Sequence, residues 1–226
     1  MNEILDIIEK DGKCKIVILE GEGSVFCSGL DLTEISDVLF GGTISGYIDR
    51  YTIEFNGILN RLISMPKVVV SNVSGLAMGG GLGIISASDL IIASYKSEFS
   101  LPEALWGLMP AIVIPFLIRR IGFHNTYKMA LTTMSVTADE ALRIGLIDEL
   151  SDNFEESIRK YSNRISRIDA DTMGSMKQYF RQFDGIDTNT EYYAANELKK
   201  MLNSPKVIDN IQKFTLFKKL PWEIRN

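Results

Sequence analysis

Four glycines within five positions, Gly79, Gly80, Gly81 and Gly83, constrain this chain more than any other feature. They lie between a β-branched run and a stretch of small apolar residues. Glycines this dense indicate that the backbone approaches another group closely. Tight packing of a helix on a sheet is one interpretation. The other is an oxyanion site, in which free amides at a helix start point at developing negative charge.

Two known phosphate-binding loops fit this segment poorly. A dinucleotide-binding turn requires the spacing GxGxxG, with an acidic residue about 20 positions later. Glu103 lies near that distance, but the glycine spacing does not match. A Walker loop requires GK[ST], which does not follow the glycines. Helix packing and an oxyanion site therefore stay open.

Strand-like and helix-like segments alternate along the first half of the chain. Residues 15–20, 67–73 and 89–94 are predicted to form buried strands, and residues 47–65 a helix. The glycine-rich residues 41–46 are predicted to be a flexible hinge. This alternation is typical of an α/β fold with parallel strands and right-handed crossovers.

The second half is helical by period. Residues 112–131 have a helical pattern, and nearly everything after about Asn153 has helical spacing. We therefore divide the chain into a core, residues 1–152, and a C-terminal helical appendage, residues 153–226. Three residues are predicted to begin helices in that appendage: Asp169, Asn189 and Ser204.

The composition favours a soluble, cytosolic protein. Apolar residues make up 46% of the 226, which is ample for a core. Residues 1–12 predict an acidic amphipathic helix rather than a secretory leader, and no apolar run approaches the roughly 20 residues that span a bilayer. A net charge of −5 disfavours nucleic-acid binding.

Cysteine and histidine are scarce. The two cysteines, Cys14 and Cys27, form no CxxC motif, and His124 is the single histidine. We expect neither a disulfide framework nor a zinc site.

An oxyanion site needs a second amide from another loop, a nearby base and a pocket that excludes water. The loop from Phe26 to Leu32 is a candidate. Its Gly29 allows a turn, and Asp31 can bond to backbone amides. Taken alone, this loop predicts only a turn.

These segments together resemble the crotonase, or enoyl-CoA hydratase/isomerase, superfamily. The resemblance implies an α/β fold with a ββα spiral core, in which two of the motifs supply the oxyanion amides. Five family motifs are matched: F-x-x-G-x-D-[LI] at 26–32, G-x-A-x-G-G-G at 75–81, D-[LI]-I-[IV]-A at 89–93, F-x-x-P-E-x-x-x-G-x-x-P at 99–110 and A-x-x-x-G-L-[VI] at 141–147.

The resemblance also implies roles for individual residues. The amides of Leu30 and Gly80 would form the oxyanion hole, and Glu103 would face the α-carbon of a thioester. Apolar neighbours of Glu103 are expected to raise its pKa by desolvation. Met78 and Trp106 suit either an acyl pocket or the core. The residues predicted to contact substrate are Cys27, Ser28, Met78, Gly79 and Trp106.

Two features depart from the family pattern. A typical hydratase has a second glutamate at the position of Gly83, where it holds the water that adds to carbon 3. Family members also begin with a β-hairpin before the first helix, and roughly the first 30 residues of that pattern are missing here.

A narrower resemblance comes from residues 99–103, 107–122 and 220–223, which are similar to the dehydratases of polyketide β-branching cassettes. These enzymes remove water from 3-hydroxy-3-methylglutaryl on an acyl carrier protein to give 3-methylglutaconyl thioester. They also keep one glutamate at the position of Glu103 and a glycine at that of Gly83.

One carboxylate suffices if Glu103 removes the α-proton and returns it to the departing hydroxyl on the same face. A single carboxylate would also suit a Δ3-Δ2 enoyl-CoA isomerase or another enoyl-CoA hydratase. An inactive binding module of this fold is the non-enzyme alternative. We expect no cofactor and no metal, because the acyl group arrives on the phosphopantetheine of a carrier protein or on coenzyme A.

The resemblance implies a homotrimer or hexamer in which the C-terminal helices take part, and no membrane partner. Three C-terminal lysines could contact a phosphopantetheine phosphate or an acidic carrier protein, although a solvated helix face is the favoured interpretation. These are Lys213, Lys218 and Lys219.

Overall fold

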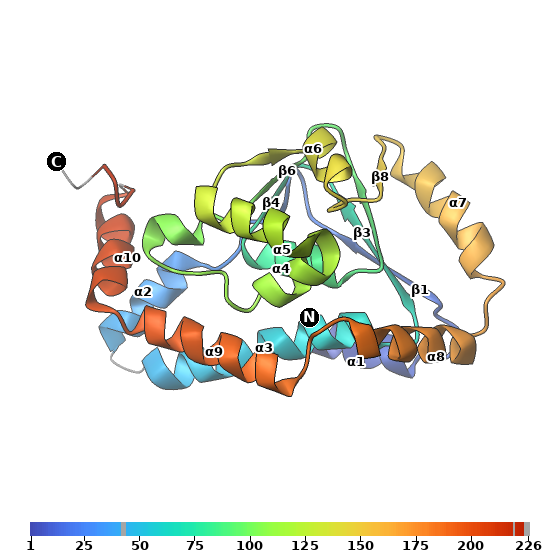
Figure 1. Ribbon diagram of the computed structural model, residues 1–226, viewed down its shortest axis with the longest axis horizontal. Coiled ribbons are helices and arrows are strands. Elements are labelled where there is room, and N and C mark those ends of the chain that lie inside the picture. Colours follow the sequence, from blue (N-terminus) through green and yellow to red (C-terminus); the bar gives the residue numbers. More distant parts are fainter. Residues whose placement is uncertain (42–43, 219, 224–226) are drawn as a thin grey trace.

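The protein is described from a computed structural model that covers residues 1–41, 44–218 and 220–223. Over these residues the strands form two sheets, with orders β1-β3-β5-β8 and β2-β4-β6-β7 (Figure 1). Only the β6–β7 pair is antiparallel. The strands are β1 Ile16–Glu20, β2 Val25–Cys27, β3 Val68–Val73, β4 Leu76–Met78, β5 Leu90–Ala93, β6 Glu98–Ser100, β7 Val136–Thr137 and β8 Glu149–Leu150.

Each of the first three turns of the chain places one strand in each sheet and then returns through helix, and in the last turn α6 lies between β7 and β8. This arrangement is the predicted ββα spiral, so the α/β prediction is confirmed. The α-helices are α1 Asn2–Lys10, α2 Leu32–Gly41, α3 Ile44–Ser64, α4 Gly80–Ala87, α5 Ile114–Thr132, α6 Ala138–Arg143, α7 Phe154–Ile165, α8 Ala170–Phe180, α9 Thr188–Leu202 and α10 Pro205–Phe217, and the 3₁₀ helices are η1 Glu103–Trp106 and η2 Arg181–Phe183.

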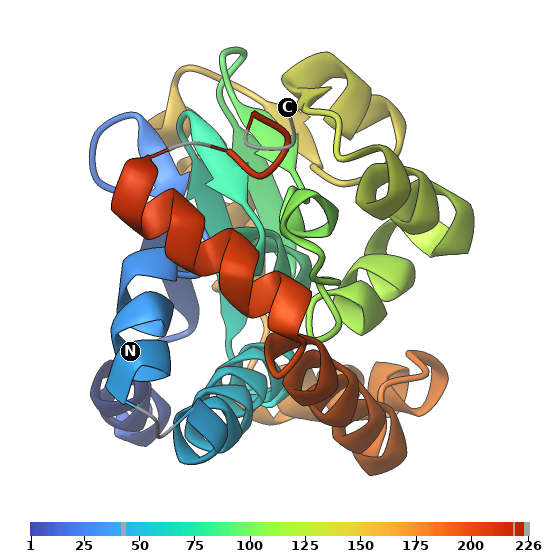
Figure 2. The ribbon, with the colours of Figure 1, turned by 90° about the vertical axis from the view of Figure 1, so that its left-hand side faces the viewer.

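The C-terminal helices share the main core. Leu198 of α9 and Ile211 of α10 belong to the same buried apolar cluster as Leu59 of α3 and Val69 of β3. Figure 1 shows α9 running beside α3, and Figure 2 shows α10 crossing in front of the strands beside α2. The appendage therefore folds back onto the body of its own chain.

A buried lysine fixes α8 to the core. The Lys177 ammonium donates to Asp89 Oδ2 at 2.7 Å and to the carbonyl oxygens of Leu62 and Lys67 at 3.0 Å. Burial lowers the pKa of Lys177, and the Asp89 carboxylate opposes that shift. These contacts join α8 to the end of α3 and to the strands that follow it.

Some predicted boundaries were wrong. Residues 41 and 44–46 are helical, because α2 continues to Gly41 and α3 begins at Ile44; residues 42–43 of the predicted hinge lie outside the described ranges. Helix α9 begins after Asp187, whose carboxylate accepts from the Thr190 amide at 2.7 Å, rather than at Asn189. Asp187, two residues before Asn189, is thus the N-cap of α9.

Helix α2 was not predicted at all. Asp31, expected to bond backbone amides, caps this helix by accepting from the Thr33 amide at 2.8 Å. Ile35, fully buried, fixes the helix to the core. Among the described residues, none of the helices combines the length and apolarity that crossing a membrane requires.

Candidate active site

Glu103 stands at the start of a short turn that follows the second sheet. Strand β6 ends at Ser100, the buried Leu101 follows, and Glu103 opens η1. The turn closes when the Leu108 amide donates to the Glu103 carbonyl oxygen at 3.0 Å, with Gly107 in the left-handed region at φ 82°. Only glycine adopts this backbone without strain, so the turn holds Glu103 in a defined place.

The loop of residues 26–32 and the glycine loop, residues 75–81, meet beside this turn. A methyl group added at Gly29 would lie 3.3 Å from the Met78 carbonyl oxygen and 3.7 Å from the Gly80 nitrogen. Gly29 and Gly79 have φ of 83° and 51°, in the left-handed region. The Gly79 amide donates to the Ser100 carbonyl oxygen at 3.0 Å, which joins the glycine loop to the strand that leads to Glu103.

The Glu103 carboxylate lies directly against the glycine loop. A methyl group at Gly79 would be 2.9 Å from Glu103 Oε1, so a larger residue there would displace the carboxylate from this position. The other oxygen, Oε2, is buried and has no hydrogen-bond partner in the described part of the chain. Burial raises the pKa of Glu103 to about 7, as expected from its apolar neighbours. An unsatisfied buried carboxylate oxygen with such a pKa is suited to exchanging a proton near neutral pH.

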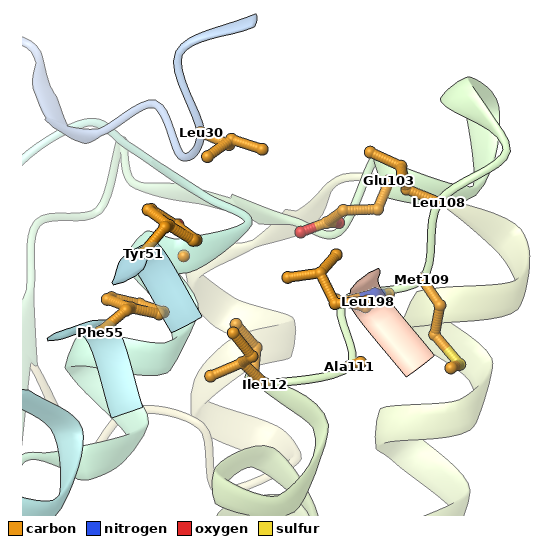
Figure 3. A pocket seen from close by; sticks show the side chains of 12 residues that line it. Leu30, Tyr51, Phe55, Glu103, Leu108, Met109, Ala111, Ile112 and Leu198 are labelled. Carbon is orange, nitrogen blue, oxygen red and sulfur yellow. The ribbon is translucent and has the colours of Figure 1, made fainter. Parts of the chain in front are cut away.

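A cavity of about 50 Å³ opens in front of this carboxylate (Figure 3). Glu103 points into it from one side, and Tyr51 and Phe55 of α3 form the opposite wall. Helix α9 contributes Leu198. The full lining is Leu30, Tyr51, Phe55, Gly80, Glu103, Leu108, Met109, Pro110, Ala111, Ile112, Val113 and Leu198.

The position where a hydratase has its second glutamate is Gly83 in this chain, and apolar side chains occupy the space around it. Gly83 is fully enclosed in α4, and a methyl group added there would lie 3.2 Å from Val113 Cγ2, 3.4 Å from Leu59 Cδ1 and 3.4 Å from Phe55 Cζ. These neighbours are carbon atoms with no capacity to bond a carboxylate. Among the described residues, Glu103 is therefore the one carboxylate that lines this cavity.

The sequence comparison decides the family. The family model described as enoyl-CoA hydratase/isomerase matches residues 1–223. The chain belongs to the enoyl-CoA hydratase/isomerase family. It is an enzyme of the hydro-lyase type, and the predicted crotonase resemblance is confirmed.

Several members of this family are similar along most of the chain. A bacillaene synthase dehydratase of Bacillus subtilis (strain 168) is 33% identical over 208 residues, covering 92% of this chain and 79% of the relative. A short-chain-enoyl-CoA hydratase of Clostridium acetobutylicum is 32% identical over 169 residues, covering 73% of this chain and 63% of the relative. The predicted similarity to polyketide dehydratases is thus also confirmed.

Solved structures of the family agree with this fold. A polyketide biosynthesis enoyl-CoA hydratase of Bacillus subtilis superposes with a TM-score of 0.86 at 31% identity, covering 97% of this chain and 86% of that one. An enoyl-CoA hydratase of Bacillus halodurans superposes with a TM-score of 0.85 at 22% identity, covering 93% and 87%. The second similarity shows the fold alone.

The enoyl-CoA hydratase/isomerase motifs bring three of the predicted residues to the cavity wall: Leu30, Gly80 and Glu103. Gly79 contacts Glu103, and Cys27 packs against the glycine loop, since a methyl group at Gly81 would lie 2.8 Å from Cys27 Cβ. Met78 is half-buried and Ser28 is exposed, and neither lines the cavity.

Trp106 points elsewhere. Its ring meets the Phe214 ring edge-on with centroids 4.7 Å apart, and its carbonyl oxygen accepts from Asn210 Nδ2 at 3.0 Å. Trp106 does not line the cavity of about 50 Å³. In this structure it fixes α10 to the turn that carries Glu103.

Two neighbouring arginines of α5, Arg119 and Arg120, lie outside the cavity lining. Arg119 lies 3.9 Å from Asp184, and Arg120 is paired with Asp148. Neither guanidinium is available to the acyl group in this arrangement.

The C-terminal lysines also have local contacts. Lys213 donates to Asp209 Oδ2 at 2.8 Å, and the Lys218 ammonium lies 5.8 Å from the centroid of the Phe214 ring. Lys219 lies outside the described residues. Over the described ranges, no group of three His, Cys, Asp or Glu side chains is arranged to hold a metal ion.

Sequence reasoning missed most of the apolar wall. Tyr51 and Phe55 are one helical turn apart on α3, and Leu198 reaches the cavity from α9. The one available signal was the aromatic spacing on the predicted helix 47–65, which also suits an ordinary core face. Leu198 gave no signal, because its proximity depends on how α9 folds back.

Proposed function

We propose that this enzyme dehydrates a 3-hydroxy-3-methylglutaryl thioester on an acyl carrier protein, giving 3-methylglutaconyl thioester in polyketide biosynthesis. The observation that carries the proposal is a single buried carboxylate, Glu103, beside the glycine loop, with apolar atoms around Gly83. The 33% identity to a relative named bacillaene synthase dehydratase supports the polyketide setting.

The two loops would stabilise the enolate. Leu30 and Gly80 line the cavity together with Glu103, and Gly80 begins α4, where the first amides have no partner within the helix. Amides aimed at the thioester oxygen are typically worth about 2.7–4 kcal/mol each in barrier height. The dipole of α4 adds to their effect.

Glu103 would then carry out both proton transfers. As the carboxylate it takes the proton from the α-carbon, and the electron pair of that C–H bond forms the enolate. When the enolate collapses, the C3–O bond breaks and Glu103 returns the proton to the departing hydroxyl as water. The raised pKa of about 7 suits both directions of this exchange near neutral pH.

The acyl group would be delivered on phosphopantetheine, so the reaction requires no cofactor of its own. We place the enzyme in the cytoplasm, where carrier proteins are loaded, and as a homotrimer or hexamer. The carrier would sit beside the two loops that contribute Leu30 and Gly80 to the cavity lining.

A Δ3-Δ2 enoyl-CoA isomerase is the second candidate, because the same observation favours it. One carboxylate facing carbons 2 and 4 can move a proton between them without any group at Gly83 to hold water. An enoyl-CoA hydratase is less compatible with the apolar contacts of Gly83.

The test incubates the purified enzyme with two substrates in parallel. Carrier-bound 3-hydroxy-3-methylglutaryl thioester should lose the mass of one water, whereas the coenzyme A form of the same acyl group should react more slowly. A 3-enoyl-CoA should not be isomerised at a comparable rate. Isomerisation of the 3-enoyl-CoA without water loss from the hydroxy acyl group would overturn the proposal in favour of the isomerase.

A further inference from the structure

The Tyr51 hydroxyl is the other polar side-chain group in the cavity wall. Among the side chains that line the cavity, only Glu103 and Tyr51 carry oxygen atoms. They come from opposite walls, Glu103 from η1 and Tyr51 from α3 (Figure 3). A substrate held in this cavity would therefore lie between Glu103 and Tyr51.

The Tyr51 ring is held in place by its neighbours on α3. It stacks between Tyr47 and Phe55, with centroid separations of 6.5 and 5.8 Å and interplanar angles of 12° and 19°. Phe55 in turn packs on Gly80 and Gly83, since methyl groups added at those glycines would lie 3.3 and 3.4 Å from its Cζ. Tyr51 is thus connected through Phe55 to α4, the helix that contains Gly80 and Gly83.

The hydroxyl itself has no protein partner within the described ranges. No hydrogen bond reaches it there, and it is absent from the buried polar atoms without a partner, so it keeps some exposure on a side chain that lines the cavity. Burial, more than any neighbour, raises the pKa of Tyr51 well above its usual range. The hydroxyl therefore stays protonated and is a hydrogen-bond donor at every working pH.

We propose that Tyr51 is a further catalytic residue, whose hydroxyl donates a hydrogen bond to the C3 hydroxyl of the substrate as the C3–O bond breaks. This inference rests on the proposed dehydration. The electron pair of the C3–O bond goes to the departing oxygen, the proton held by Glu103 completes the water molecule, and Tyr51 keeps its own proton. With Gly83 enclosed by apolar atoms, Tyr51 provides the polar contact that a second carboxylate gives elsewhere.

The test separates the two halves of the reaction. In deuterated water, carrier-bound 3-methylglutaryl thioester, which lacks the hydroxyl, reports α-proton exchange alone; the 3-hydroxy-3-methylglutaryl thioester reports elimination. Tyr51→Phe should lower elimination by roughly 10- to 100-fold, the usual worth of a hydrogen bond to a group that gains charge, while leaving α-exchange close to wild type.

Tyr47→Phe is the matched control. It removes a hydroxyl from the same stack, one turn earlier and outside the cavity lining, and should leave both rates unchanged. Elimination by Tyr51→Phe at the wild-type rate, or an equal loss of exchange and elimination, would overturn the assigned role. Failure of the wild-type enzyme to eliminate water would instead overturn the proposed function itself, and with it the role of Tyr51.

Discussion

At the scale of single residues, Gly83 shows how packing selects chemistry. The glycine leaves just enough room for Val113, Leu59 and Phe55, so no side chain at this position reaches the substrate. Added atoms in a filled core force their neighbours to move, at a typical cost of about 1–3 kcal/mol. A carboxylate there would also be buried without a partner.

We therefore predict that Gly83→Ala lowers the free energy of unfolding by up to about 2 kcal/mol, because the overpacking cost of about 1–3 kcal/mol is partly offset by about 1 kcal/mol of helix propensity, and that Gly83→Glu lowers it further without creating hydratase activity. Urea denaturation and a hydration assay check this. Gly57→Ala is the control: an added methyl group there meets nothing within 4 Å in α3, so helix propensity should leave stability equal or slightly higher. A stable Gly83→Glu variant that hydrates enoyl-CoA would show that the apolar contacts are not a barrier.

Glu103 should make the reaction depend on pH. Its carboxylate form must remove the α-proton, and its pKa is about 7. The logarithm of kcat/KM should therefore rise with a slope of about one up to roughly neutral pH and then level off. A profile that is flat from about pH 5.5 to 8 would contradict the assignment of Glu103 as the base.

The same raised pKa affects the stability of the fold. Over the pH range in which kcat/KM rises, the free energy of unfolding should fall. Between 4.5 and about 7 the folded chain keeps a proton that the unfolded chain has released, so Glu103 costs stability as the pH rises through this window. Glu103→Gln removes this cost. We expect the variant to be more stable than wild type at about pH 8, by up to about 3 kcal/mol, and the difference to vanish towards about pH 4.

At the scale of elements, the sequence predicted the longest strand and the longest helix but missed α2 and the three-residue strands of the second sheet. The strand in residues 67–73 and the helix in residues 47–65 are long enough to show their period, and both are present. Strands β2, β4 and β6 have three residues each, too few for alternation to be visible. They form the second sheet only because the spiral sets them side by side.

Helix α8 offers a test of how the C-terminal elements are attached. Lys177 makes three polar contacts with the core from a largely buried position. Lys177→Met should destabilise the protein by about 3–5 kcal/mol, because it leaves the Asp89 carboxylate without its cation. Urea denaturation measures the loss.

The control for this prediction is Lys213→Met in α10. Lys213 pairs with Asp209 at 2.8 Å, but 41% and 54% of their side-chain surfaces are exposed. An exposed pair of this kind is worth about 0–1 kcal/mol. Equal effects of the two substitutions would show that α8 is held by its apolar contacts alone.

At the scale of the whole molecule, the candidate site was partly predictable. The glycine loops and Glu103 were found because close backbone approach leaves a mark in the sequence, and the family motifs fix their spacing. Trp106 was misleading, since a large apolar residue beside a catalytic motif serves packing as readily as binding. The walls formed by α3 and α9 depend on contacts between distant segments, which no local pattern encodes.

An apolar groove of about 370 Å³ on the surface bears on the proposed assembly. Four of its side chains are exposed on α5, by 37–67%: Ile118, Phe123, Tyr127 and Leu131. Contiguous apolar surface of this kind is typical of protein interfaces.

We predict that light scattering gives the mass of a trimer or hexamer for the wild-type protein, and that Tyr127→Glu combined with Leu131→Glu gives monomers. Ile53→Glu, at an exposed apolar position on α3 outside this groove, should leave the mass unchanged. A wild-type monomer, or an unchanged mass for the α5 double variant, would contradict this assignment of the groove.

The central claim is that one buried carboxylate carries out both proton transfers of the dehydration, and the most direct measurement is the mass of the carrier-bound substrate after incubation with wild type and with Glu103→Gln. Circular dichroism verifies that both are folded. The wild type should remove one water from the 3-hydroxy-3-methylglutaryl group, and Glu103→Gln should leave the mass unchanged. Water loss catalysed by Glu103→Gln at the wild-type rate would show that another group moves the proton.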